Sequence, residues 1–340
     1  MSIIRYGIIG CGIIHETHLK AIAALPECAK LVAVCDNNPE ALRKTVEKTG
    51  VKGYASAAEL VADPDIDVIT VCTPSGLHAD HAIMALNAGK HAISEKPMDI
   101  DLSKADEMIA ASKRNNRLLA VISQTRYGDG AQQLHKWIDA GKFGRLIHGN
   151  ARLFYYRSQE YYDSAGWRGT WAMDGGGALM NQGVHYVDQL IWAMGLPKTV
   201  YALAGCLGHE RVEVEDTVSA TIEFESGAIG SLTATTCAYP NRGGLLDVLG
   251  ATGSAQIRDA KLVYADFADG TRFDPTADQG TAALDPRLGG FVEHYTQLRD
   301  ITQAIVDGRQ PEITMQDGRN ALQLVLAVYE SARTGRVVTL

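Results

Sequence analysis

The chain has 340 residues, of which 46% are hydrophobic and 21% are charged, so it is long enough for two cores and has an ordinary globular composition. Its net charge of −8 argues against a general nucleic-acid surface, although a local basic pocket for an anionic substrate remains compatible with it. A strand pattern that begins almost at Met1 leaves no room for a signal peptide, and no apolar run approaches transmembrane length, so we expect a cytoplasmic protein without membrane contact.

The segment from Ile3 to His18 has the pattern of a dinucleotide-binding turn. An apolar strand pattern runs into Gly10-Cys11-Gly12 and then into a helical segment. The first glycine permits a tight reversal, and the second lets backbone N–H groups approach a pyrophosphate at the positive end of the helix. His15 stands where a small residue usually allows close packing, so a plain strand–turn–helix is the alternative for this motif alone.

Asp36 favours the cofactor-binding interpretation. It ends the apolar run from Leu31 to Cys35, at about the distance where an acidic residue accepts hydrogen bonds from the adenosine ribose. Its carboxylate would repel a 2′-phosphate, and Arg43 is the only nearby arginine that could compensate. We therefore expect NAD rather than NADP.

From Ile3 to about Ser123, strand patterns alternate with helical patterns, which predicts a doubly wound parallel sheet. Asn38-Pro39 is typical of a helix start, and Gly89 is typical of a helix end. Further strands are expected at residues 67–72, 91–94 and 118–123. The helices between them are expected near residues 77–88 and 102–113.

The pattern changes after a helical crossover near residues 130–140. Longer alternating strands predict an open, mostly antiparallel sheet. One face of the strand from Thr217 to Phe224 is apolar and the other carries Ser and Thr, which suits subunit packing or solvent exposure equally. The expected strands cover residues 144–156, 199–207, 216–224 and 228–238. Two C-terminal helices with one apolar face each are expected at residues 291–307 and 317–334.

The overall prediction is an α/β fold of two domains. Residues 1–123 would bind NAD, and residues 124–340 would bind substrate and form the oligomer, with C-terminal helices able to pack back on the first domain. The six cysteines show no C-x-x-C pairing and no metal-ligand spacing, so we expect reduced, buried residues and no metal site. They are Cys11, Cys28, Cys35, Cys72, Cys206 and Cys237.

Glu95-Lys96-Pro97 follows the fifth parallel strand and places a lysine at the carboxyl edge of the sheet, where such folds bind ligands. Beside a cationic nicotinamide ring, Lys96 should bind its proton less tightly and exchange it with a substrate hydroxyl. A surface lysine in a turn is the alternative. One strand earlier, Thr73, Pro74 and His78 occupy the same edge, where they would line the nicotinamide ribose or merely shape the loop.

A glycine-rich loop at residues 175–177 leads into a helix that carries Asn181, His185 and Asp188. Asn181 and His185 are four residues apart and share a face, and Asp188 follows the histidine by three residues. A lone helical histidine is usually structural. Here the glycines would let a ligand approach the backbone, and the face offers an amide, an imidazole and a carboxylate able to orient it, which favours a site.

Aromatic residues and an arginine crowd the segment before that helix. This composition suits stacking on a sugar and binding its hydroxyls, and it also suits a subunit interface; we favour a substrate lid. Arg168 offers a planar donor for a carboxylate or hydroxyl oxygens. The residues are Tyr155, Tyr156, Tyr161, Tyr162, Trp167, Arg168 and Trp171.

Taken together, these residues resemble the Gfo/Idh/MocA family, named for glucose-fructose oxidoreductase, inositol dehydrogenase and a rhizopine catabolism protein. The resemblance covers essentially the whole chain, and the combination of motifs is far more specific than any one of them. The motifs are Gly10-Cys11-Gly12, Cys72-Thr73-Pro74, Glu95-Lys96-Pro97, Gly175-Gly176-Gly177 and Asn181-x-x-x-His185. Residues 167–171 and 178–183 are most similar to the branch of UDP-N-acetyl-glucosaminuronate 3-dehydrogenases.

The resemblance implies an N-terminal Rossmann domain, a C-terminal α/β domain with an open sheet, NAD(P) bound between them, and a homodimer or homotetramer formed through that sheet. It also implies that Lys96 and His185 handle the proton. Many members carry Asp where this chain has Asn181, and an amide cannot relay a proton, so Asn181 should only position a hydroxyl.

The resemblance extends to the individual contact residues. Those implied for the cofactor are Gly10, Gly12, Ile13, Ile14, Asp36, Asn37, Thr73, Pro74, His78, Glu95, Lys96 and Gln124. Those implied for the substrate are Lys96, Arg168, Asn181, His185, Trp167 and Tyr155.

The function predicted from the sequence is that of an NAD-dependent dehydrogenase, which oxidises a secondary ring hydroxyl of a sugar, sugar nucleotide or cyclic polyol, or reduces the ketone. One alternative is an NAD-retaining glycosidase of the same fold. Another is a dinucleotide-sensing binding protein without catalysis, which the presence of both Lys96 and His185 disfavours.

Overall fold

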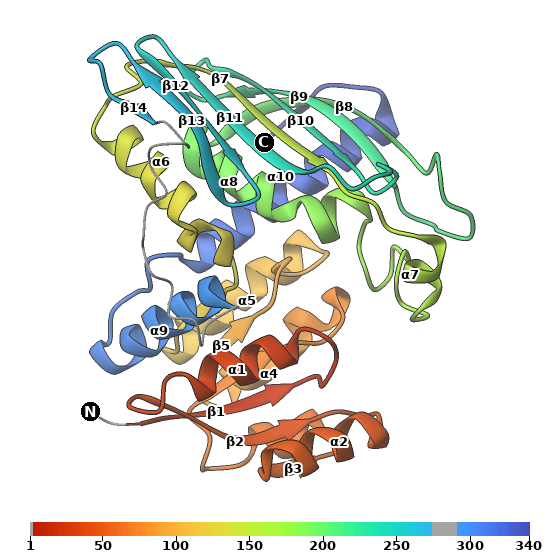
Figure 1. Cartoon of the computed structure of the whole chain (residues 1–340). Coiled ribbons are helices and arrows are strands. Elements are labelled where there is room, and N and C mark those ends of the chain that lie inside the picture. The colour runs from red at the N-terminus through yellow and green to blue at the C-terminus, as the bar shows by residue number, and fades with distance from the viewer. Residues whose placement is uncertain (1–2, 274–290) are drawn as a thin grey trace. The chain divides into compact units, whose positions relative to one another are not determined.

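The computed structural model describes residues 3–273 and 291–340, and the chain divides by its contacts into two units (Figure 1). The first unit comprises Met1–Gln124 and Ala283–Arg319, and the second comprises Thr125–Ala282 and Asn320–Leu340. Among the described residues, no helix combines the length and the apolar character needed to cross a membrane.

A six-stranded parallel sheet forms the centre of the first unit, as the alternating patterns predicted. Its order is β3-β2-β1-β4-β5-β6, so the order reverses between β1 and β4. The strands are β1 (Ile4–Ile9), β2 (Ala29–Cys35), β3 (Lys52–Tyr54), β4 (Val68–Val71), β5 (His91–Ser94) and β6 (Leu119–Val121). The edge strand β3 was not predicted, because its sequence Lys-Gly-Tyr contains no apolar run.

The helices of this unit begin and end where the sequence chemistry indicated. The Asn38 side chain accepts hydrogen bonds from the backbone N–H groups of Glu40 and Ala41 at the start of α2, and Gly89 adopts a φ of +76° after α4. The helices are α1 (His15–Ala23), α2 (Pro39–Thr49), α3 (Ala57–Val61), α4 (His78–Asn87) and α5 (Leu102–Asn115), with a 3-10 turn at Ser75–Leu77.

A helix from the C-terminal part of the chain completes the first core. Leu298 and Ile301 of α9 (Val292–Asp307) are fully buried in the same apolar cluster as β1. The hydroxyls of Tyr6 and Thr302 lie 2.6 Å apart, and the Gln297 amide accepts a hydrogen bond from the backbone N–H of Ser123. The next helix, α10 (Met315–Thr334), is divided between the two units at Arg319.

The second unit contains a nine-stranded sheet of order β14-β13-β12-β11-β7-β10-β9-β8-β15. It is antiparallel except for the pair β7 and β10. The strands that the sequence predicted are β7 (Leu146–Phe154), β8 (Pro197–Gly205), β9 (Thr217–Phe224) and β10 (Ile229–Thr235). The others are β11 (Gly243–Gly250), β12 (Gly253–Arg258), β13 (Lys261–Phe267), β14 (Arg272–Phe273) and β15 (Val338–Thr339).

Helices cover one face of this sheet, and the other face is open (Figure 1). In β9 the side chains of Val218, Ala220, Ile222 and Phe224 are buried, whereas Ser219 and Thr221 are exposed, as the alternation predicted. The helical elements of the unit are α6 (Asp129–Asp139), α7 (Gln159–Asp163), a π-helical turn at Ala178–Gly183 and α8 (Val184–Met194), with a 3-10 turn at Gln124–Tyr127.

Candidate active site

The carboxyl ends of the parallel strands in the first unit, hereafter the cofactor edge, border a cavity of about 330 Å³. The loops that follow β1 and β4 both line it, at the reversal of strand order where open α/β sheets bind ligands. Six residues predicted from the sequence meet there: Gly10, Gly12, Asp36, Asn37, Thr73 and Pro74. Residues that sequence reasoning missed also line it: Ile9, Cys35, Ala55, Ala57, Cys72, Leu77 and His81.

Glycine is required for different physical reasons at the two positions of the first turn. Gly10 has a φ of +99°, and a Cβ there would lie 2.6 Å from the carbonyl oxygen of Cys72. A Cβ on Gly12 would meet no heavy atom of the described chain within 4 Å. The space beside Gly12 therefore suits a pyrophosphate that approaches the backbone where α1 begins, with Ile13 exposed and Ile14 directly before the helix.

Asp36 both shapes the turn and faces the cavity. Its Oδ2 accepts a hydrogen bond of 2.7 Å from the backbone N–H of Cys11, and its Oδ1 accepts one of 2.7 Å from that of Asn38. A carboxylate has about four acceptor positions, so ribose hydroxyls can still be bound. The support that Asp36 gives to the turn was not foreseen from the sequence.

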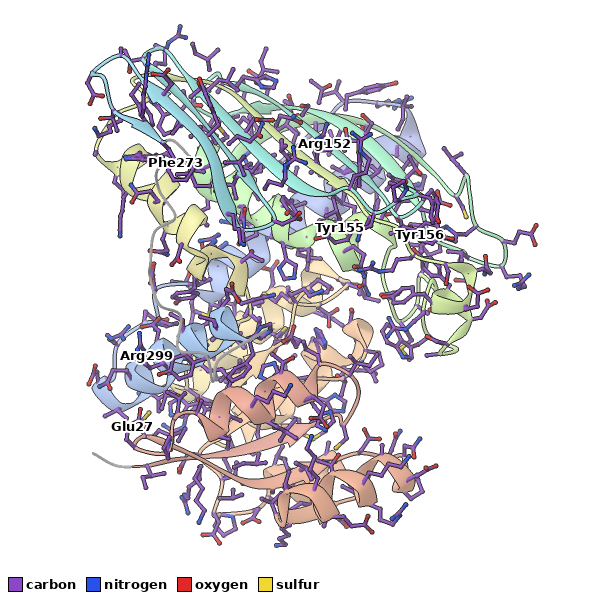
Figure 2. All side chains as sticks on the ribbon, in the orientation of Figure 1. Glu27, Arg152, Tyr155, Tyr156, Phe273 and Arg299 are labelled. Carbon is purple, nitrogen blue, oxygen red and sulfur yellow. The ribbon has the colours of Figure 1, made fainter. Side chains whose placement is uncertain are left out.

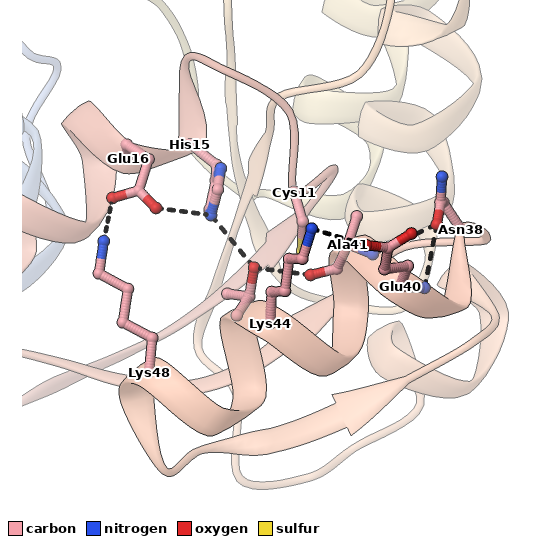
Figure 3. A pocket seen from close by; sticks show the side chains of 9 residues that line it. Cys11, His15, Glu16, Asn38, Glu40, Ala41, Lys44 and Lys48 are labelled. Carbon is pink, nitrogen blue, oxygen red and sulfur yellow. Dashed lines mark hydrogen bonds and ion pairs between the residues drawn. The ribbon is translucent and has the colours of Figure 1, made fainter.

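A second cavity, of about 360 Å³, is lined by Cys11 and by residues of α1 and α2 (Figure 3). Its two lysines are paired with carboxylates, Lys44 with Glu40 and Lys48 with Glu16. Arg43 pairs with Glu47 at 2.7 Å and does not line this cavity. No cation lining the second cavity is therefore without a carboxylate partner among the described residues, which favours NAD over NADP.

His15 explains how the turn tolerates a large residue where a small one is usual. Its Nε2 lies 3.3 Å from the Thr45 hydroxyl on α2, and its Nδ1 contacts the carbonyl oxygen of Gly12. The ring therefore joins α1, the turn and α2, so a bulky side chain is accommodated at this helix start.

Glu95 is buried and holds the segment that carries Lys96. Its Oε1 lies 2.7 Å from Nε2 of His18 and 3.5 Å from Nε2 of His294, and its Oε2 accepts the backbone N–H of Lys96 at 3.1 Å. Burial opposes ionisation, but the hydrogen bond with His18 and the nearby His294 imidazole hold the pKa of the Glu95 carboxyl well below its usual range. Burial also lowers the pKa of His18, and a neutral imidazole still donates its Nε2–H to the carboxylate. The backbone of Lys96 is therefore held in a fixed position.

His78 connects two loops of the cofactor edge. Its Nδ1 lies 2.7 Å from the carbonyl oxygen of Pro97, and its Nε2 lies 2.9 Å from that of Thr73. The side chain is buried and both ring nitrogens face backbone oxygens. This geometry favours the interpretation that His78 shapes the loops rather than contacts a ligand.

Gln124 stands just after β6 and offers a buried acceptor. Its Oε1 has no hydrogen-bond partner within the described part of the chain. A buried acceptor of this kind calls for a donor, and a cofactor amide is one group that supplies it. Gln124 is not among the residues that line the cavity of the cofactor edge, so its contact with NAD stays a prediction.

In the second unit, Asn181 lies in the π-helical turn and His185 in the first turn of α8. π-Helical turns are rare and frequently occur at functional sites. The glycines before it were expected to admit a ligand, and the structure gives them a different role. A Cβ on Gly176 would lie 2.1 Å from the Tyr329 hydroxyl, and one on Gly177 would lie 2.0 Å from the carbonyl oxygen of Glu215. The chain itself fills that space, so the glycines serve close packing.

Polar side chains around Asn181 form a connected set, hereafter the polar network: Arg157, Tyr161, Asp174, Asn181 and Gln182. Asn181 donates its amide hydrogen to Asp174 and accepts a hydrogen bond of 2.7 Å from Gln182. Gln182 in turn accepts one of 2.7 Å from Arg157 and donates one of 3.2 Å to Tyr161. The buried Asp174, missed in the sequence, therefore fixes the orientation of the Asn181 amide.

Arg168 is held by the aromatic residues of its own segment. Its guanidinium lies 4.6 Å from the ring centres of both Tyr161 and Trp167, and its Nη1 donates a hydrogen bond of 2.8 Å to the Tyr161 hydroxyl. Tyr155 and Tyr156 follow β7 (Figure 2); Tyr155 is partly buried and Tyr156 is exposed. Arg168 and Trp167 thus form one stacked unit, and Tyr155 belongs to a different element.

Asp188 has a strong partner that the sequence did not reveal. Its two oxygens accept hydrogen bonds of 2.8 Å and 2.6 Å from Nε and Nη2 of Arg126, and both side chains are buried. Two hydrogen bonds leave acceptor positions on this carboxylate, so the expected role of Asp188 in orienting His185 stays a prediction.

Two family models match the chain in succession. The model described as the oxidoreductase family with an NAD-binding Rossmann fold matches residues 4–123. The model described as the GFO/IDH/MocA C-terminal domain matches residues 131–256. Both matches agree with the two sheets described above.

Individual proteins are similar over the full length. The 1,5-anhydro-D-fructose reductase of Ensifer adhaerens is 30% identical over 98% of this chain and 97% of its own length. The crystal structure of the WlbA dehydrogenase from Bordetella pertussis with NADH and UDP-GlcNAcA is 35% identical, with a TM-score of 0.92 over 100% of this chain and 98% of that one. A levoglucosan dehydrogenase with NADH and levoglucosan is 26% identical, with a TM-score of 0.89 over 99% of each chain.

Proposed function

Since the chain belongs to the GFO/IDH/MocA family of NAD-binding oxidoreductases, we propose that it is a dehydrogenase that oxidises a secondary ring hydroxyl of a sugar, sugar nucleotide or cyclic polyol, or reduces the matching ketone. This proposal rests on the cofactor edge. The loops at that edge of one sheet carry Asp36, the open space beside Gly12 and the fixed backbone of Lys96. When bound, NAD supplies the hydride acceptor for such a reaction.

Lys96 and His185 are proposed to handle the hydroxyl proton. Lys96 is the cation that directly follows β5, and its backbone is tied to the buried Glu95 carboxylate. His185 is only partly buried, so its ring can reach a ligand. In oxidation these groups would take the proton from the hydroxyl oxygen, and in reduction they would return it. Asn181, oriented by Asp174, would position a substrate hydroxyl.

We propose a nucleotide-linked hexuronate as the substrate class. The relative crystallised with UDP-GlcNAcA shares 35% identity over the whole chain, against 30% for the anhydrofructose reductase and 26% for the levoglucosan dehydrogenase. Arg168 supports the choice, because its stacked guanidinium presents a fixed planar donor suited to a carboxylate. A free sugar or an inositol is the next candidate.

The open face of the large sheet is the proposed oligomer contact. On that face, three apolar side chains are each more than two-fifths exposed: Tyr201, Leu203 and Ile229. They lie among Ser and Thr side chains of β9 and β10. Burial of these apolar groups would favour a homodimer or homotetramer. We further propose that the enzyme works in the cytoplasm, where its six free cysteines would stay reduced.

A substrate screen tests the function directly. The purified chain is incubated with NAD and, in separate reactions, UDP-GlcNAcA, UDP-GlcNAc, free hexoses and myo-inositol, and NADH absorbance is followed. We expect the fastest NADH formation with UDP-GlcNAcA. Failure of every sugar and polyol would refute the dehydrogenase assignment, and glycoside cleavage without net NADH would identify the NAD-retaining glycosidase instead.

Arg168→Ala tests the substrate class. A hydrogen bond to a charged group contributes about 1.5–3 kcal/mol, so KM for a carboxylate substrate should rise roughly tenfold or more with kcat little changed. KM for the neutral analogue UDP-GlcNAc should rise by a smaller factor. Arg211→Ala is the control, because Arg211 forms an exposed ion pair with Asp163. Equal losses for both substrates would mean that Arg168 only holds its segment.

A further inference from the structure

Four side chains with metal-ligating atoms converge at one end of the large sheet, at a place the proposed reaction does not use. Cys206 directly follows β8, His209 and Asp216 lie in the loop before β9, and Cys237 follows β10. The ligating atoms of His209, Asp216 and Cys237 all lie within 4.8 Å of one another. Cys206 Sγ lies 3.7 Å from Oδ2 of Asp216 but is not within 4.8 Å of all three other ligating atoms. The four residues are hereafter the Cys206 cluster.

Three of the distances within the Cys206 cluster lie close to the edges of a tetrahedral zinc site, and Cys206 must still approach the remaining ligands. Ordinary zinc bond lengths place a sulfur about 3.6 Å from a nitrogen or oxygen ligand, and a nitrogen about 3.4 Å from an oxygen ligand. Cys237 Sγ lies 3.6 Å from His209 Nδ1, Cys206 Sγ lies 3.7 Å from Asp216 Oδ2, and that oxygen lies 3.0 Å from His209 Nδ1. The known edges therefore need adjustments of only a few tenths of an ångström.

The Nε2 atom of His209 makes the kind of hydrogen bond that supports a metal-binding histidine. Nε2 lies 2.8 Å from the backbone carbonyl oxygen of Arg157, so Nε2 carries the hydrogen. In the neutral ring, this assignment leaves the Nδ1 lone pair directed at Asp216 Oδ2, itself an acceptor. Two lone pairs 3.0 Å apart require a cation between them, either a proton or a metal ion. A backbone carbonyl that fixes the other nitrogen is the usual support of a ligating histidine.

The backbone also holds the carboxylate in place. Asp216 is fully buried, and its Oδ2 accepts the N–H groups of Gly208 and His209 at 2.8 Å and 3.0 Å. A Cβ on Gly208 would lie 2.7 Å from Cys237 Sγ, so the glycine allows the loop to approach the thiol closely. Cys206 is exposed, which gives an ion a route into the cluster.

We propose that Cys206, His209, Asp216 and Cys237 bind a divalent metal ion of the zinc class, which fixes the loop between β8 and β9. Two thiolates, an imidazole and a carboxylate form a donor set that zinc accepts. The ion serves a structural purpose, because the same loop supports the substrate side of the unit: Glu215 accepts the backbone N–H groups of Gly177 and Leu179. The proposal departs from the sequence-based expectation of no metal site, because ligands that are up to thirty-one positions apart form no recognisable spacing motif.

Metal content and cobalt spectroscopy test the proposal on the full chain. Protein purified without a polyhistidine tag is loaded with Zn²⁺, dialysed and analysed for metal per chain, and a second sample is titrated with Co²⁺. We expect one tightly bound ion per chain, the intense visible bands of tetrahedral Co²⁺, and a charge-transfer band from thiolate to cobalt. The midpoint temperature of thermal unfolding should rise when Zn²⁺ is bound and should return to its original value when a chelator removes the ion.

Cys206→Ser and the double variant C206S/C237S should lose most of the bound metal, the thiolate band and the Zn²⁺-dependent thermal shift. Cys28→Ser is the matched control and should keep all three, because Cys28 lies in the first unit. Substoichiometric metal in the wild type, or equal binding by the double variant, would overturn the proposal. A thiol titration that finds four instead of six free thiols, with no metal bound, would also overturn it, because the two sulfurs would then form a disulfide.

Discussion

The cofactor edge of the first unit and the polar network of the second unit are built in contrasting ways. At the cofactor edge, the functional residues follow several parallel strands, among them β1, β2 and β4, and the sheet brings the strand ends together. In the polar network, the side chains hold one another: Asp174 fixes Asn181, and Arg157 and Tyr161 bind Gln182. One region is organised by backbone order and the other by contacts between side chains.

This difference predicts different responses to mutation. A substitution at the cofactor edge should change chemistry or cofactor choice, because the sheet keeps the backbone in place. A substitution among the buried polar pairs of the second unit should change stability, because each side chain there depends on its partners. Four substitutions test the contrast, and a fifth, Glu95→Gln, tests the buried carboxylate that supports the cofactor edge.

Lys96→Met should give the largest effect on rate. Losing a positioned acid–base group typically costs about two to four orders of magnitude in turnover, and NAD binding should stay largely intact. His185→Ala should act in the same direction, less completely. Steady-state kinetics and NAD titration measure both quantities. Lys104→Met is the control, since Lys104 forms an exposed pair with Asp80. Near-normal turnover of the Lys96 variant would make this lysine structural.

Arg126→Met should give the largest effect on stability. It leaves the buried Asp188 carboxylate without its bidentate partner, which costs about 3–5 kcal/mol in the free energy of unfolding. Chemical denaturation measures the loss. Arg43→Met removes only an exposed pair with Glu47 and should change stability by less than about 0.5 kcal/mol. If both variants were equally stable, the buried pair would not be a structural element of the second unit.

Asp36→Ala should narrow the preference for NAD over NADP. The carboxylate no longer repels a 2′-phosphate or accepts ribose hydroxyls, so the ratio of kcat/KM values for NAD and NADP should fall roughly tenfold. Both cofactors are compared at equal concentration. Asp65→Ala, which removes an exposed carboxylate, should leave the ratio unchanged. A clear preference of the wild type for NADP would contradict the assignment.

Glu95→Gln should change how stability responds to acid. The hydrogen bond with His18 and the nearby imidazole of His294 outweigh burial and lower the pKa of Glu95 in the folded chain. Its stabilising effect is therefore complete above the ordinary glutamate pKa of about 4.3 and is lost as the pH falls below it. Urea unfolding of both proteins between neutral and acidic pH should show the stability gap narrowing on acidification. A constant gap would mean that this ionisation does not contribute to stability.

The sequence by itself determined most elements of the first unit, four strands of the large sheet and the cofactor edge. Alternating strand and helix patterns fixed the parallel sheet, and since residues after parallel strands meet at one edge, Gly10, Asp36 and Thr73 were placed together without coordinates. The period-two pattern of β9 likewise gave its buried face. These inferences succeed because they depend only on local periodicity and strand order.

The tertiary structure decided which polar side chains are partners. Arg126 and Asp188 are separated by sixty-two residues, and His18 and Glu95 by seventy-seven. Such pairs leave no periodic signal, because a hydrogen bond depends on where two distant backbones meet and not on spacing along the chain. The same reason hid the role of Asp174 and the convergence of His209 and Asp216 with Cys237. It also explains why the glycines at residues 176–177, interpreted from the sequence as room for a ligand, instead make room for Tyr329 and Glu215.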